Sequence, residues 1–196
     1  MASAKLYDRK ERTTSAAQRR RDRNREPLSQ KESFRWYEEV DRAVQEDQGA
    51  LSYTVVADRE ADIYESLILW TTLGVDFVVR SFHNRRIQHE SASNLIQALE
   101  AQAVQWEYQV ALPATDKRSA HTAQLEVKWI KTPLTRPRSG TGTKHLAKQQ
   151  EVTVIEVAEN PASVVGKEKP IYWRLLTSHE VKSPEDALRI VGYYIQ

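Results

Sequence analysis

The sequence contains no cysteine and little glycine or proline, with 6 and 7 of these among 196 residues. Without cysteine there are no disulfides, no thiol catalysis and no cysteine-ligated zinc, which is typical of a cytoplasmic protein. The scarcity of glycine and proline excludes a low-complexity chain. No apolar run reaches ten residues, and residues 1–6 lack the apolar core of a signal peptide. The sequence therefore predicts neither a membrane span nor an export signal.

Apolar residues make up 40% of the chain, enough for a core in one domain, or in one domain with a sizeable insertion. The net charge of +2 conceals an uneven distribution. Residues 1–30 carry nine basic and four acidic side chains, a balance of +5 that leaves −3 for the remainder. Such an arginine-rich arm indicates a polyanionic partner, most simply nucleic acid, although a solvated terminus has the same composition.

The segment after that arm has the pattern of an α/β unit. Apolar residues fall at helical spacing over 33–44, and a β-branched run covers 51–57. A second helical stripe covers 61–73, and a short apolar run covers 75–81. A strand, a helix and a strand within about 30 residues form a βαβ unit, so the two strands should be parallel.

The rest of the chain has mostly the pattern of strands. One further helix is expected over 93–103, after which β-rich segments alternate with polar loops. These segments predict an antiparallel sheet with long connections: 106–112, 123–130 and 151–158. A last strand over 171–177 precedes a helix that begins at Ser183-Pro184, where serine is a good cap and proline a good first helical residue.

Asp58 directly follows the strand over 51–57, at the place where α/β sheets hold their ligands. Carboxylate oxygens suit Mg²⁺ or Mn²⁺, and two such ions held by several carboxylates can drive phosphodiester cleavage. Asp62 lies four residues further on. By position alone a second interpretation is simpler, in which Asp58 or Asp62 caps the helix that follows.

Five segments resemble, in the same order, the DDE transposases of bacterial insertion sequences, in particular the insertion-sequence-four family. They are KESFRW at 31–36, VVADREADIY at 55–64, FVVRS at 77–81 followed by His83, WRLLTS at 173–178, and ALRIV at 187–191 followed by Tyr194. The resemblance runs from about residue 28 to residue 196, and its most specific part is the block at 58–62.

The resemblance implies an α/β fold with an incomplete RNase H-like core and an inserted, mostly antiparallel β subdomain. It divides the chain into a basic arm or loop (1–30), a partial core (31–103), the insertion (104–170), and a return strand with the start of the last helix (171–196). It also implies Mg²⁺ or Mn²⁺, with two ions in the complete site. The implied partners are transposon-end DNA and, for the complete protein, a second copy, with a cytoplasmic, nucleoid-associated location.

The resemblance also assigns four site residues by position. Asp58 matches the second catalytic Asp, which is a metal ligand, and Arg80 matches a basic residue near the transposon-end DNA. Trp173 matches an aromatic residue that receives a base flipped out of the strand, and Tyr194 matches a tyrosine that contacts end DNA. From spacing alone Arg80 is a surface residue at a strand end, and Trp173 and Tyr194 belong to the core.

Two departures from the family narrow the expected function. The first catalytic Asp of the family has no counterpart before residue 30, and its Arg and Glu after the tyrosine would lie beyond Gln196. We therefore expect a central fragment or decayed copy of a transposase, inactive alone, whose complete form cleaves DNA and transfers strands at transposon ends. The alternative is a non-catalytic DNA-binding remnant. A third interpretation is an unstable product with an exposed apolar stripe over 187–195.

Overall fold

The computed structural model describes residues 15, 34–48, 50–116, 118–138, 144–166 and 169–195. Apart from Ser15, the predicted basic arm over 1–30 lies outside these residues. None of the helices in the described ranges is long and apolar enough to cross a membrane.

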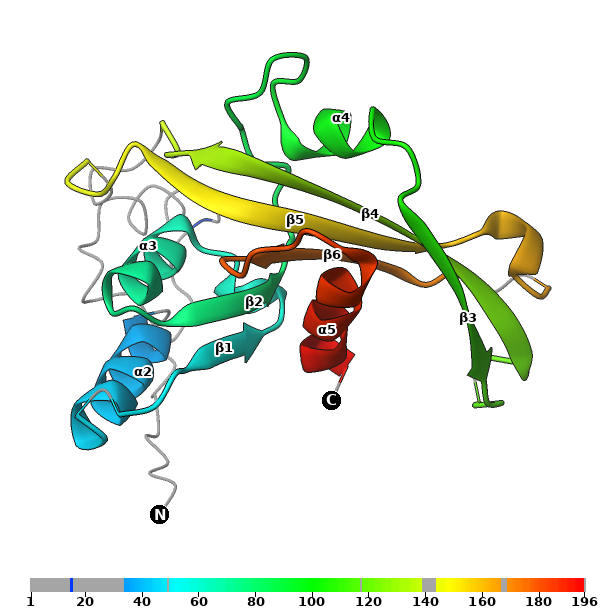
Figure 1. The fold of residues 1–196 in the computed structure, drawn as a ribbon, viewed down its shortest axis with the longest axis horizontal. Coiled ribbons are helices and arrows are strands. Elements are labelled where there is room, and N and C mark those ends of the chain that lie inside the picture. Colours follow the sequence, from blue (N-terminus) through cyan, green and yellow to red (C-terminus); the bar gives the residue numbers. More distant parts are fainter. Residues whose placement is uncertain are drawn as a thin grey trace.

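Six strands form one curled, mixed sheet in the order β1-β2-β6-β5-β4-β3 (Figure 1). The strands are β1 (Thr54–Ala57), β2 (Asp76–Arg80), β3 (Trp106–Leu112), β4 (His121–Thr135), β5 (Gln149–Glu159) and β6 (Tyr172–Thr177). β1 and β2 are parallel, which confirms the predicted βαβ unit, and every other pairing is antiparallel. The strands expected in an insertion are thus hydrogen-bonded, through β6, into the sheet that contains β1 and β2. The division of the chain at residues 103 and 170 stays a prediction.

Helices cover both faces of the sheet. The α-helices in the described ranges are α2 (Arg35–Glu46), α3 (Tyr64–Thr72), α4 (Leu95–Glu100) and α5 (Pro184–Ile195). On one face α2, α3 and α4 pack in a cluster that contains Trp70 and Phe77, both fully buried. On the other face α5 packs on β2, β4, β5 and β6. The mixed α/β class expected from the sequence is therefore confirmed.

The predicted exposed stripe over 187–195 is wrong, because three of its apolar residues are buried against the sheet. Ala187 and Ile190 are fully enclosed and Val191 is nearly so. The predicted start of this helix is confirmed, since the Oγ of Ser183 accepts a hydrogen bond from the backbone N–H of Asp186 at 3.2 Å. The apolar face of α5 is buried by strands that are distant in the sequence, so the sequence of the helix alone did not reveal this packing.

The predicted capping of the second helix is also wrong. A short 3₁₀ turn, η3 (Arg59–Ala61), follows Asp58, whose side chain makes no capping hydrogen bond. α3 then begins at Tyr64, with Ile63 in the cap position and no side-chain cap. Neither Asp58 nor Asp62 therefore caps α3. Gly74 ends this helix as expected, in the left-handed conformation at φ +72° that glycine adopts without strain.

The strand predicted over 123–130 is longer in the structure, where β4 runs to Thr135 and includes Pro133. A proline in the sequence indicated a loop at this point. β3 accompanies β4 only as far as Val127. Beyond it, that side of β4 has no further strand beside it in the described ranges, only an isolated bridge between Ile87 and Leu134. A proline is tolerated there because it needs no ladder partner for its missing N–H.

Candidate functional site

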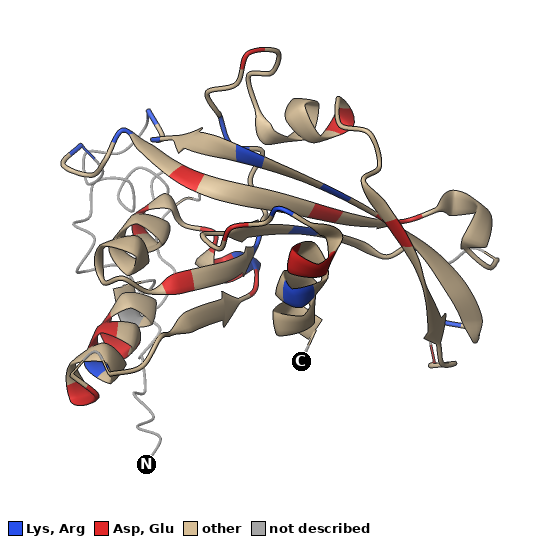
Figure 2. Cartoon of the chain, in the orientation of Figure 1, with Lys and Arg blue, Asp and Glu red and all other residues tan. Residues whose placement is uncertain are grey.

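The fold brings together the four site residues that the sequence predicted. Asp58 follows β1, Arg80 ends β2, Trp173 lies near the start of β6, and Tyr194 lies in the last turn of α5. β1 and β2 are parallel, so their carboxyl ends reach the same edge of the sheet. β6 runs antiparallel to β2, which brings its first residues to that edge. Figure 2 shows acidic and basic residues meeting where β1 and β2 end.

Three of these side chains touch one another. The Tyr194 hydroxyl donates a hydrogen bond to Oδ1 of Asp58 at 3.2 Å. The Nη1 atom of Arg80 lies 3.8 Å from the same oxygen and 3.5 Å from the Tyr194 hydroxyl. The Trp173 ring stands edge-on to the Tyr194 ring, with centroids 6.5 Å apart. A carboxylate, a guanidinium and two aromatic rings from four separate elements therefore form one cluster, which we call the Asp58 cluster.

The environment of Asp58 favours its charged form. The backbone N–H of Arg59 is the main cause that holds the pKa of Asp58 below its usual value, and the Tyr194 hydroxyl and Arg80 guanidinium act in the same direction. Burial is the main cause that raises the pKa of Tyr194. The Arg80 guanidinium opposes this shift, and Asp58 acts in the same direction as burial. The Asp58 side chain is 65% exposed, so solvent screens these interactions and they add little to stability. Asp58 is thus an accessible, ionised carboxylate.

We expect the variant Tyr194→Phe to raise the pKa of Asp58, because it removes a hydroxyl that donates to the carboxylate. The carboxyl ¹³C shift of Asp58, followed by NMR as pH falls below 5, measures this change. Stabilisation from the lowered pKa is present above the unfolded value of about 3.9 and is lost as pH falls through the folded value. Tyr193→Phe is the matched control, since the Tyr193 ring faces His179. Equal curves for both variants would contradict the contact.

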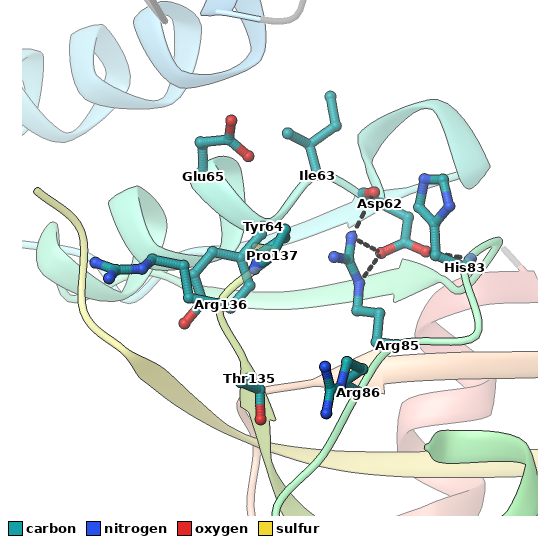
Figure 3. Close-up of a pocket in the computed structure, with 10 residues that line it drawn as sticks. All are labelled: Asp62, Ile63, Tyr64, Glu65, His83, Arg85, Arg86, Thr135, Arg136 and Pro137. Atoms are coloured by element: carbon teal, nitrogen blue, oxygen red, sulfur yellow. Dashed lines mark hydrogen bonds and ion pairs between the residues drawn. The ribbon is translucent and has the colours of Figure 1, made fainter. Parts of the chain in front are cut away.

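Asp62, the second aspartate of this segment, lies in a different environment. It is 1% exposed, and its Oδ2 accepts hydrogen bonds from the backbone N–H groups of Phe82 at 2.7 Å and His83 at 2.9 Å. Its Oδ1 accepts from Nε of Arg85 at 2.9 Å and from Nη2 of the same guanidinium (Figure 3). Asp62 therefore anchors the loop that follows β2 and is inaccessible to a substrate.

Sequence reasoning missed Arg85. The resemblance included His83 but stopped there, and no local pattern marks an arginine in a polar loop as buried. In the structure Arg85 is 9% exposed, and it also donates to the backbone carbonyl of Asp62 at 2.6 Å. The buried pair ties the turn after β1 to the loop after β2, so it sets the relative position of Asp58 and Arg80.

Asp58 is the one carboxylate among the four residues of the Asp58 cluster. The ranges that the structure describes contain no group of three or more histidines and acids placed to hold a metal ion. One carboxylate with a guanidinium 3.8 Å away does not by itself hold two divalent ions. The described residues around Asp58 thus do not make up a two-ion centre.

No protein-family model matches the chain.

Proposed function

We propose that this chain carries part of the catalytic core of a DDE-type transposase, in an RNase H-like fold, and that its Asp58 cluster binds transposon-end DNA. In the complete site Asp58 would be one of several carboxylates that hold Mg²⁺ or Mn²⁺ for DNA cleavage and strand transfer. The remaining acids of that site are not among the described residues beside Asp58.

One observation carries the proposal. The four residues that the resemblance singled out are up to 136 positions apart in the sequence, yet they meet at one edge of the sheet. Nothing in their local patterns required this, since each has an ordinary structural explanation in its own element. The convergence also falls at the carboxyl ends of parallel strands, where α/β sheets hold ligands.

Each group of the cluster has a chemistry suited to DNA. The aromatic faces of Trp173 and Tyr194 can stack on an unpaired base, and the Arg80 guanidinium can pair with a backbone phosphate. The Arg80 side chain is 23% exposed, so it reaches solvent. It is also held in place, because Nη2 donates to the Tyr172 carbonyl at 3.4 Å. The contacts with Asp58 also orient the Arg80 guanidinium and the Tyr194 hydroxyl.

The first test concerns Trp173 and is a DNA-binding experiment. Wild-type protein should bind a duplex with one unpaired base more tightly than a fully paired duplex. We expect Trp173→Ala to remove about 1–3 kcal/mol of this preference, the usual contribution of one base stacked on an aromatic ring. Fluorescence anisotropy with labelled duplexes at fixed salt measures both affinities.

Trp106→Ala is the matched control, because Trp106 is 42% exposed at the start of β3, which β5 and β4 separate from β6 and its Trp173 (Figure 1). The preference between two duplexes does not respond to a general loss of folded protein, which lowers both affinities alike. A preference that persists in Trp173→Ala would contradict the stacking role.

A second candidate function is DNA binding without cleavage. One observation favours it for this chain: the Asp58 carboxylate already has two partners, the Tyr194 hydroxyl, which donates a hydrogen bond to it, and the Arg80 guanidinium, which opposes its charge. The two candidates share the DNA contacts and differ in chemistry alone. Asp58-dependent cleavage of DNA is expected for the first candidate function and is not expected for the second.

A further inference from the structure

A cleft of about 380 Å³ lies beside the buried Asp62–Arg85 pair (Figure 3). Three segments form its walls: the turn into α3 around Asp62, the loop after β2 from His83 to Arg86, and the end of β4 around Arg136. The segments are joined by hydrogen bonds, since the backbone N–H of Thr135 donates to the Arg86 carbonyl at 2.8 Å. The cleft is therefore built from fixed backbone.

One end of the cleft carries a positive charge that no nearby acid among the described residues neutralises. Asp62 is used by Arg85 and by two backbone N–H groups. Arg86 is exposed, lines the same cleft, and its guanidinium makes no hydrogen bond or ion pair with any residue in the described ranges. Glu65 lies at the opposite end of the cleft from Arg86 in Figure 3. The Arg86 end thus offers a guanidinium for a bound anion.

An exposed aromatic ring stands next to this cleft. Phe82 is 62% exposed, which is unusual for so large an apolar side chain. Its ring meets the His83 ring edge-on, with centroids 5.2 Å apart, and His83 lines the cleft. Asp62 holds the backbone N–H groups of both residues. The ring is therefore presented to solvent on an anchored loop.

We propose that Phe82 and Arg86 form a binding site for one nucleotide of a single-stranded DNA segment, with the base stacked on Phe82 and its phosphate on Arg86. An exposed aromatic ring and an unneutralised guanidinium four residues apart on one anchored loop suit a nucleotide, because stacking and phosphate pairing are the two interactions that bind single strands. A single strand leaves its bases free to stack, unlike a duplex. The choice of DNA rests on the proposed function of the Asp58 cluster, which the same loop adjoins through Arg80.

The test compares two labelled strands of equal length and charge, an oligothymidylate and its abasic counterpart, by fluorescence anisotropy on the full chain. We expect Arg86→Gln to weaken both complexes and to lower the slope of log K against log salt by about 0.7, the value for one phosphate on a single strand. We expect Phe82→Leu to weaken binding of oligothymidylate about fivefold to tenfold and to leave the abasic strand unchanged, because leucine keeps the apolar volume and loses the ring.

Lys131→Gln is the matched control for charge, because Lys131 is an exposed cation on β4, away from the cleft. If Arg86→Gln behaves like Lys131→Gln, or if Phe82→Leu affects both strands equally, this site is wrong. The proposed function would still stand in that case if Trp173→Ala loses its preference for an unpaired base. If that preference is absent from wild-type protein while Phe82→Leu discriminates the two strands, the nucleotide site stands and the proposed role of the Asp58 cluster falls.

Discussion

Asp62→Ala is expected to destabilise the fold by about 3–5 kcal/mol, the cost of leaving one member of a buried ion pair without its partner. Arg85 is only 9% exposed, so in this variant its guanidinium is left buried without a carboxylate. The backbone N–H groups of Phe82 and His83 also lose their acceptor. Unfolding by urea, followed by tryptophan fluorescence, measures the loss.

Asp58→Ala is the matched control, because it removes the same side chain four residues away from an exposed position. Its effect on the free energy of unfolding should stay below about 1 kcal/mol, as for other surface ion pairs. A second comparison isolates the ion pair: Asp62→Ala combined with Arg85→Met should cost less than the sum of the single variants, since it buries no unpaired charge. Similar losses for Asp62→Ala and Asp58→Ala would contradict the buried anchor.

The second large effect concerns activity. If the proposed function is right, Asp58→Ala in a full-length transposase that contains this segment should lower the rate of DNA cleavage at the transposon end at least about 100-fold, because the variant removes the proposed metal ligand. Binding of the same DNA should be retained, since Arg80 and Trp173 remain. A labelled end fragment with Mg²⁺ or Mn²⁺, resolved by gel, measures cleavage, and anisotropy measures binding.

Glu60→Ala controls for the loss of an acid from the same exposed turn. If Asp58→Ala leaves end cleavage intact, the metal-ligand role is wrong. The chain described above supplies the complementary measurement: cleavage of end DNA with Mn²⁺ by this chain alone would contradict the candidate function of binding without chemistry.

Local patterns in the sequence were sufficient for the elements near the site. The βαβ unit and the Ser183 cap depend on residues within one or two turns, so hydrophobic spacing and cap chemistry predicted them correctly. The end of β4 was predicted wrongly, because its length follows from pairing with β5.

The two aspartates of the 58–62 block show what the sequence alone could not determine. Their spacing and residue type are those of helix caps, and the sequence alone could give both of them that role. In the structure the Asp62 carboxylate meets the N–H groups of Phe82 and His83 and the guanidinium of Arg85, at least 20 positions away. Asp58 meets Tyr194.

The sequence by itself determined which residue types stand at the carboxyl ends of β1 and β2. The resemblance pointed to four site residues, and two of them, Asp58 and Arg80, stand at those ends. The tertiary structure alone decided that those four meet, that Asp62 is buried as an anchor, and that Phe82 and Arg86 are exposed at the surface. The physical reason is that burial and charge pairing depend on chain segments brought together by the sheet, and such contacts leave no pattern in a local stretch of sequence.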